Sequence, residues 1–119
     1  LKLAAPAAFT ILSGDDSLTL PFLSVGAVGV ISVASNIVPK DVADLVKAWE
    51  SGDAATALKH HLRLYPLFKD LFIESNPAPV KAAMSWMGMI QPDVRLPLVQ
   101  ISEASAARLR GTLAKLQLL

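Results

Sequence analysis

The chain has 119 residues, of which 53% are hydrophobic and 18% charged, with a formal net charge of +1 and no cysteine. The length fits one domain or a piece of one, and the near-zero charge creates no field that attracts nucleic acid or an acidic membrane. Without cysteine the chain has neither disulfides nor a cysteine-ligated zinc site, which is compatible with the cytoplasm.

The apolar content is high for so short a chain, because a small domain must cover proportionally more surface with polar groups. It favours a segment whose apolar faces are covered by further protein. At the start, residues 1–5 predict the end of a helix that is stopped by Pro6. Residue 1 is Leu and no signal-peptide pattern follows it, so we expect a truncation or processing point there.

Two short apolar runs predict buried parallel strands over residues 8–13 and 28–33. A short helix is predicted between them over residues 17–25, with Gly26 as its stop. Both runs end in polar residues, and α/β barrels build their active sites at the C-terminal ends of the strands. Two strands cannot satisfy their own edges or bury both faces, so the pattern predicts an incomplete sheet. The missing strands belong to the same barrel or to another chain.

Residues 18–34 are almost uncharged and are the stretch most easily mistaken for a membrane span. The stretch is only about as long as the shortest spanning helix, and Pro21, Gly26 and Gly29 interrupt it. These breaks fall where a helix, a turn and a strand need them. We therefore favour a buried helix–turn–strand and expect no membrane segment here.

The middle of the chain predicts two helices. Residues 40–51 form an amphipathic helix that starts after Pro39 and ends at Gly52. A longer helix over residues 53–73 is capped by its first residue, an aspartate, and Pro66 should kink or divide it. The side chains expected on one buried side of this longer helix are Ala57, Leu58, His61, Leu62, Tyr65, Phe68 and Phe72.

Two more helices are predicted near the C-terminus. Asn76-Pro77 opens one that ends at Gly88, and Ser102 caps the other after a proline-rich connection over residues 91–100. The side chains expected to face inward are Val80, Ala83, Met84 and Met87 in the first helix, and Ala106, Leu109, Leu113 and Leu116 in the second.

Some polar residues suggest chemistry, and each also has a structural explanation. Asp15 and Asp16 form a carboxylate pair suited to acid–base work, but we favour one capping the following helix while the other holds a loop. Adjacent His60 and His61 suggest a metal site, but neighbouring helical residues point about 100° apart, so we favour ordinary core or surface histidines. Arg95 more simply braces a loop than binds an anion.

The order of short motifs resembles the dihydrodipicolinate synthase family over nearly the whole chain. The motifs similar to its seventh and eighth strand regions are Ser13-Gly14-Asp15-Asp16, Gly26-Ala27, Gly29-Val30-Ile31-Ser32-Val33, Ser35-Asn36 and Pro39. Those similar to its C-terminal helical extension are Asn76-Pro77-Ala78-Pro79-Val80-Lys81, Met87-Gly88 and Arg95-Leu96-Pro97-Leu98. The related N-acetylneuraminate lyases usually continue the eighth strand with Gly-Ser-Thr-Tyr-Asn, where this chain has Ile31-Ser32-Val33-Ala34-Ser35-Asn36. This difference favours the synthase over the lyase.

The resemblance implies an α/β fold, with the last two strands of a (β/α)8 TIM barrel in residues 1–52 and a C-terminal helical extension in residues 53–119. It implies condensation of pyruvate with aspartate 4-semialdehyde in lysine and diaminopimelate biosynthesis, through a Schiff base on a sixth-strand lysine. That lysine, a tyrosine–threonine proton relay and the arginine that holds the semialdehyde all precede the matched region. The resemblance therefore implies no catalytic residue in this chain, and Lys2 is no substitute because it lies at a predicted helix end.

Two binding positions carry over from the family. Gly14 matches a glycine at the end of strand seven, where the backbone comes close to the ligand. Ile31 matches a strand-eight residue whose backbone carbonyl faces the Schiff-base lysine and bound pyruvate. The resemblance also implies a cytoplasmic homotetramer when intact, no metal or organic cofactor, and no activity for this chain by itself.

Two other functions stay open on the residues alone. One is a non-catalytic helical interaction module that retains parts of a barrel, and it would unfold as an independent two-state domain. The other is a different pyruvate-dependent aldolase of the same superfamily, such as one acting on keto-sugar acids.

Overall fold

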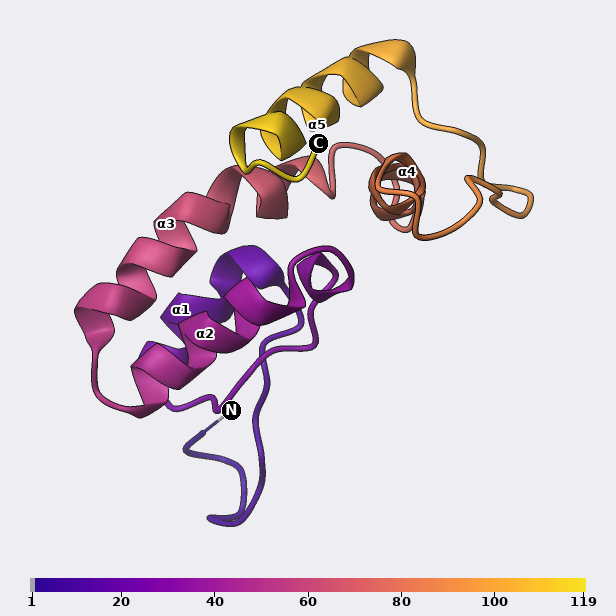
Figure 1. Ribbon diagram of the computed structural model, residues 1–119. Coiled ribbons are helices and arrows are strands. Elements are labelled where there is room, and N and C mark those ends of the chain that lie inside the picture. The colour runs from indigo at the N-terminus through magenta and orange to yellow at the C-terminus, as the bar shows by residue number, and fades with distance from the viewer. Residues whose placement is uncertain (1) are drawn as a thin grey trace. The chain divides into compact units, whose positions relative to one another are not determined.

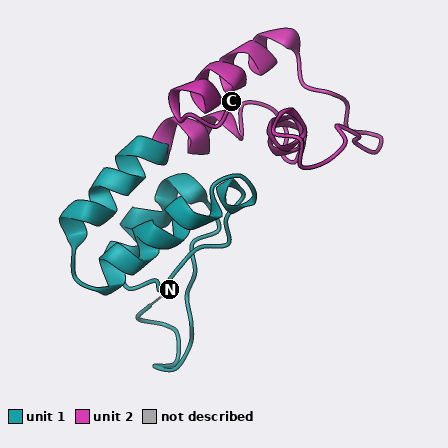
Figure 2. Ribbon diagram, in the orientation of Figure 1, with its two compact units in different colours: residues 1–64 teal, residues 65–119 magenta. Residues whose placement is uncertain are grey.

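The computed structural model describes residues 2–119. The elements follow one another as η1 (Asp16–Leu18), α1 (Thr19–Ser24), η2 (Ala34–Asn36), α2 (Pro39–Glu50), α3 (Ala54–Asp70), α4 (Ala78–Trp86) and α5 (Glu103–Lys115) (Figure 1). The chain divides into two compact units, residues 1–64 and residues 65–119 (Figure 2). No helix in the described range is both long enough and apolar enough to span a membrane.

The strands predicted over residues 8–13 and 28–33 are not formed as regular strands. Among residues 2–119 a single isolated parallel bridge remains, between Ser13 and Val30. The two extended segments still run side by side around this bridge (Figure 1). The prediction of regular strands was wrong because two short segments without further neighbours cannot extend a ladder on either outer edge.

The helical end predicted over residues 1–5 is also wrong for the described residues, because residues 2–4 form a turn. Leu1 lies outside the described range. So few residues before Pro6 cannot close a series of helical hydrogen bonds. The helix predicted over residues 17–25 is confirmed as η1 followed by α1, and Gly26 ends it with a φ of 98°.

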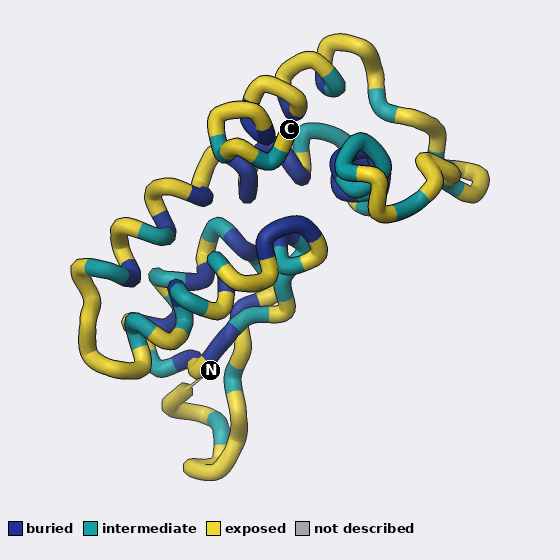
Figure 3. The backbone as a smooth tube through the Cα atoms, viewed as in Figure 1, coloured by how far each residue is buried: buried dark blue, intermediate teal, exposed yellow. Residues whose placement is uncertain are grey.

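The core of the first unit lies between its short helices and the extended segments. Its buried apolar side chains are Leu23, Ala27, Ala34, Ile37, Val38, Val42, Leu45, Ala57 and Leu64 (Figure 3). The amphipathic helix predicted over residues 40–51 is confirmed as α2, and it begins at Pro39, whose fixed φ suits the first helical position.

Helix α3 is confirmed with its cap, but its buried side is partly different from the prediction. The Asp53 carboxylate accepts the N–H of Thr56 at 3.0 Å, which is a helix N-cap. The predicted core residues that are exposed are Leu58, Leu62, Tyr65 and Phe72, and the buried residues are Ala57, His61, Leu64, Leu67, Phe68 and Leu71. The buried residues follow helical spacing, so the stripe exists but is rotated about the helix axis.

Pro66 lies inside α3 without dividing it into two helices. Proline removes the N–H that would bond the carbonyl of Leu62, one turn earlier. Both residues are exposed, so water can satisfy that carbonyl and the helix continues.

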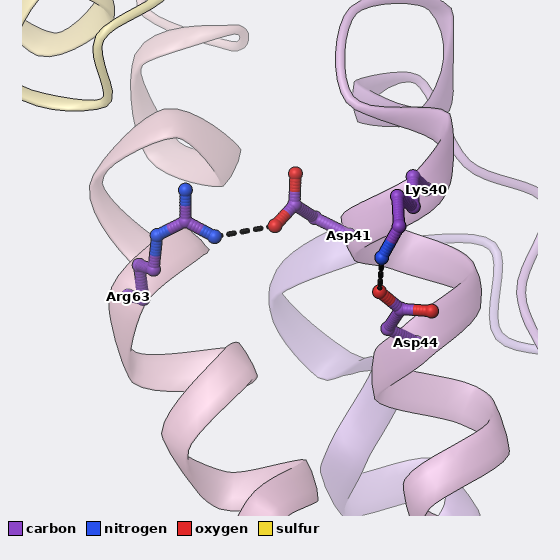
Figure 4. Close-up of polar contacts among 4 residues, drawn as sticks. All are labelled: Lys40, Asp41, Asp44 and Arg63. Atoms are coloured by element: carbon purple, nitrogen blue, oxygen red, sulfur yellow. Dashed lines mark hydrogen bonds and ion pairs between the residues drawn. The ribbon is translucent and has the colours of Figure 1, made fainter.

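Two ion pairs lie on α2 in the first unit. Arg63 on α3 donates to the carboxylate of Asp41, which links the two helices (Figure 4). Lys40 pairs with Asp44 one turn further along α2, and their hydrogen bond raises the pKa of Lys40 and lowers the pKa of Asp44. Exposed pairs of this kind contribute little to stability. Only the Arg63–Asp41 pair joins α2 to α3, since Lys40 and Asp44 both lie on α2.

The second unit packs α5 against the end of α3 around a buried carboxylate. Asp70 is 3% exposed, and it accepts the Nε–H of Arg108 at 2.8 Å and the hydroxyl of Thr112 at 2.6 Å. Leu109 and Leu113 of α5 are fully buried, as predicted. Ala106 and Leu116 are only half-buried.

The predicted cap of α5 is found in the second unit, whereas α4 begins after Pro77 without a side-chain cap. The Ser102 hydroxyl accepts the N–H of Ser105 at 3.3 Å, which confirms the N-cap of α5. Helix α4 follows the cis Asn76–Pro77 bond, and Gly88 follows its end with a φ of 73°. Of its predicted inward residues Val80 and Ala83 are buried, while the two methionines, Met84 and Met87, are half-buried.

Candidate functional site

The extended segments of the first unit are joined by three backbone hydrogen bonds. The N–H of Val28 donates to the Ile11 carbonyl at 3.0 Å, and the N–H of Ser13 donates to the Gly29 carbonyl at 2.8 Å. The N–H of Ile31 then donates to the Ser13 carbonyl, also at 2.8 Å. A methyl group at Gly29 would come within 3.2 Å of the Leu12 side chain, so glycine permits this close approach.

This register brings the two predicted binding positions to the same end of the pair of segments. Gly14 directly follows Ser13, whose carbonyl is bonded to Ile31. An added Cβ at Gly14 would meet no atom within 4 Å, and the Ile31 residue is 69% exposed. The space beside Gly14 is therefore open within this chain. The binding roles of Gly14 and Ile31 themselves stay predictions.

The two aspartates after Ser13 have separate structural tasks, and neither is paired with the other. One carboxylate oxygen of Asp15 accepts both the N–H and the hydroxyl of Ser17 at 2.7 Å, which caps η1. The interpretation that one aspartate caps the following helix is thereby confirmed.

Asp16 confirms the other half of that interpretation by holding a loop. It is 1% exposed, and its Oδ2 accepts the N–H groups of Val33 and Ala34, both at 2.9 Å. Its other oxygen, Oδ1, and the Thr19 hydroxyl are buried without a hydrogen-bond partner. Hydrogen bonds from N–H groups to a carboxylate are stronger than neutral ones. Asp16 thus fastens the segment after Ile31 to the loop after Ser13.

Sequence reasoning missed the role of the Ser13 hydroxyl in the turn that follows it. Its hydroxyl accepts the N–H of Asp15 at 3.2 Å and donates to the Asp15 carbonyl at 2.8 Å, which closes a tight local turn. The signal available in the sequence was a serine followed by Gly-Asp at a predicted strand end, a composition typical of turns in which side chains bond to the nearby backbone.

The pocket next to Lys2 lies apart from these loops. It has a volume of about 370 Å³ and is lined by Lys2, Leu3, Ile11, Phe22, Val25 and Ala27. All of its lining residues except Lys2 are apolar, and neither Gly14 nor Ile31 contributes to it. This pocket supports no role for Lys2 in the site around Ser13.

The adjacent histidines do not form part of a metal centre in the described residues. No group of three or more His, Asp or Glu side chains there is arranged to hold a metal ion. His61 is 7% exposed on α3, and burial lowers its pKa from the ordinary value for histidine. Its position fits the interpretation of His61 as a core residue.

A family model of the dihydrodipicolinate synthetase family matches residues 1–116. A 4-hydroxy-tetrahydrodipicolinate synthase of Endomicrobium trichonymphae is 49% identical over 109 residues, which cover 92% of this chain and 38% of that protein. The solved synthase of Aquifex aeolicus superposes with a TM-score of 0.96 at 46% identity, covering 98% of this chain and 40% of that one. The solved synthase of Methylacidiphilum fumariolicum SolV gives a TM-score of 0.95 at 50% identity, and the match covers 97% of this chain and 38% of that one.

The chain belongs to the dihydrodipicolinate synthetase family. It spans less than two fifths of the length of the curated relative from Endomicrobium trichonymphae. The resemblance seen in the sequence is thus confirmed at the level of the family.

Proposed function

We propose that this chain is the C-terminal portion of a Schiff-base synthase that condenses pyruvate with aspartate 4-semialdehyde. Residues 1–52 supply the last two strand segments of a (β/α)8 barrel, and residues 53–119 supply a helical extension. The observation that carries the proposal is the family match over residues 1–116, together with the parallel register that brings Gly14 and Ile31 to one end. In barrels that end carries the active site.

The chemistry follows from the family. A lysine amine from the preceding part of the barrel attacks the pyruvate carbonyl, and loss of water leaves an imine. Loss of a proton from the pyruvate methyl group gives an enamine, whose carbon forms the new bond to the aldehyde of the semialdehyde. The protonated imine on this lysine is the electron sink, so neither a metal nor an organic cofactor takes part.

This chain's own contribution is binding and orientation. Gly14 leaves room for the ligand beside the loop, since no atom of the chain lies within 4 Å of a Cβ placed there. The Ile31 carbonyl accepts a hydrogen bond near the imine without adding a full charge. The intact enzyme works in the cytoplasm as a homotetramer, and the chain alone is inactive because it lacks the Schiff-base lysine.

A chimaera tests this proposal. The part of the Aquifex aeolicus synthase that precedes the matched region is joined to this chain, and borohydride is added with pyruvate. We expect a reduced pyruvate adduct on a lysine of the Aquifex part, and turnover when aspartate 4-semialdehyde is supplied.

Two controls accompany the chimaera. This chain alone and the Aquifex part alone should give neither adduct nor turnover. A pyruvate adduct on any lysine of residues 1–119 contradicts the proposal. Turnover with pyruvate and sugar aldehydes but not with the semialdehyde points instead to a keto-sugar-acid aldolase of the same superfamily.

A further inference from the structure

We infer that Ser13 is a positioning residue that keeps the Ile31 carbonyl out of the backbone ladder, so that this carbonyl is left to face the substrate. The inference rests on the proposed function, which places that carbonyl beside the pyruvate imine. It concerns a hydroxyl group that takes no part in the chemistry itself.

The geometry of parallel pairing fixes the order of the hydrogen bonds between the two segments. In a parallel ladder one residue bonds to the two residues that flank its partner, and the next bond is donated two residues further along. Ser13 follows this rule with Gly29 and Ile31, through bonds of 2.8 Å each. The next bond in the series would run from the N–H of Asp15 to the carbonyl of Ile31.

That next bond is replaced by a bond within the turn. The N–H of Asp15 donates to the Ser13 hydroxyl oxygen at 3.2 Å, and the hydroxyl donates in turn to the Asp15 carbonyl at 2.8 Å. Ser13 is 1% exposed, so water does not compete for its hydroxyl. The ladder therefore stops at the N–H of Ile31, and the Ile31 carbonyl has lost its regular donor.

Asp16 holds the following residues at the same time. Its carboxylate bonds to the N–H groups of Val33 and Ala34 at 2.9 Å, and Ala34 is fully buried. This second anchor lies just beyond Ile31 and prevents the segment from shifting along its neighbour. With both ends fixed, the direction of the Ile31 carbonyl is set before the substrate binds, which is the condition for accurate orientation.

Removing the Ser13 hydroxyl should therefore turn the Ile31 carbonyl away from the substrate without unfolding the chain. In a Ser13→Ala variant the N–H of Asp15 has no side-chain acceptor and the nearest regular partner is the Ile31 carbonyl. The ladder then extends by one bond and turns this carbonyl away from the imine. Misplacement of a reacting group by about 1 Å lowers rates by up to about 100-fold.

The experiment uses the chimaera with pyruvate and aspartate 4-semialdehyde. We expect Ser13→Ala to lower kcat/KM for pyruvate by about 10- to 100-fold. Ser13→Thr keeps the hydroxyl and should restore most of the activity. Ser17→Ala is the matched control, because its hydroxyl bonds only to the side chain of Asp15 in the same loop, at 2.7 Å, and it should stay close to wild type.

Equal kcat/KM in the Ser13→Ala and wild-type chimaeras overturns the inference, and so does an equal loss in Ser13→Ala and Ser13→Thr. A crystal structure of the wild-type chimaera decides the point independently of any variant's folding. The inference is supported if the N–H of Asp15 donates to the Ser13 hydroxyl, and it is overturned if this N–H donates to the Ile31 carbonyl. An inactive wild-type chimaera contradicts the proposed function, while the crystal structure still tests the ladder.

Discussion

At the scale of single residues, the buried carboxylate of Asp70 is the clearest polar determinant of the second unit. Its side chain is 4% exposed, and its partners Arg108 and Thr112 both come from α5. A buried donor or acceptor that loses its partner costs the free energy of desolvating it. Asp70 is thus expected to contribute far more to stability than the exposed pairs on α2.

We predict that Asp70→Ala lowers the free energy of unfolding by about 1–3 kcal/mol, because the Thr112 hydroxyl loses its acceptor and Arg108 its ion pair. Urea denaturation of the chimaera, followed by the fluorescence of its tryptophans, measures this change. Asp44→Ala removes only an exposed ion pair and serves as the control. A midpoint unchanged by Asp70→Ala and equal to that of the control would show that the buried carboxylate does not stabilise the fold.

The buried His61 side chain should make the stability of the chain depend on pH. Burial lowers its pKa below the value of about 6.5 that it has in the unfolded chain. The unfolded state then binds the proton more readily, so this residue's contribution to stability is complete above about pH 6.5 and is lost as pH falls through the folded pKa. The melting temperature of the chimaera should fall between neutral and mildly acidic pH. In the His61→Gln variant this fall should be smaller. An unchanged slope in the variant would exclude His61 as its source.

At the scale of elements, two side chains, Ser102 and Glu74, together hold the first turn of α5. The Ser102 hydroxyl accepts the N–H of Ser105 and also donates to the Glu74 carboxylate at 2.8 Å. The N–H of Ser102 donates to the same Glu74 oxygen at 2.9 Å. Hydrogen bonds from the Ser105 side chain and from Ser102 hold the pKa of Glu74 below its ordinary value. Helix α5 is therefore fastened to residue 74 at its first turn.

We predict that Ser102→Ala destabilises the second unit by about 1 kcal/mol, the ordinary effect of losing an N-cap. Ser102→Thr should restore stability, because threonine both accepts and donates. Ser102→Asp should not, although aspartate is normally a good cap, because it places a second carboxylate against Glu74 and has no proton to donate. Thermal melts of the three variants check the order, and a stabilising aspartate would refute the role given to Glu74.

At the scale of the whole molecule, the chain leaves large apolar side chains uncovered in the segments that carry the candidate site. The exposed members in the first unit include Phe9, Leu12, Val25, Val28 and Ile31. Exposed groups of this size are usual at interfaces and become sites of aggregation when they are left open. The high apolar content of the sequence is consistent with the proposal that further protein covers these faces.

We predict that this chain expressed alone binds a hydrophobic dye strongly and aggregates, whereas the chimaera remains soluble and binds the dye weakly. The extended segments gain neighbours on both edges in the chimaera, so their exposed apolar faces become buried. Size-exclusion chromatography with dye fluorescence compares the two. A soluble chain with a two-state melt and weak dye binding would favour the helical interaction module instead.

Most of the helices, most of their ends and the family could be predicted from the amino-acid sequence. The caps at Asp53 and Ser102 and the glycine stops are local signals, because hydrogen bonds within a turn involve residues only a few positions apart. The sequence also indicated that the two apolar runs cannot complete a sheet by themselves, and only an isolated bridge joins them.

The buried side of α3 and the hydrogen bonds of Ser13 and Asp16 depend on how distant segments pack together, so they could not be predicted from the sequence. A helical stripe can rotate by one position without changing its spacing, and the neighbouring elements settle which side chains are covered. Asp16 finds its donors 17 and 18 residues away, and no local pattern specifies a partner at that distance. The Ser13 hydroxyl can end the backbone ladder only when residues 29–31 lie beside Ser13, and the sequence does not show that they do.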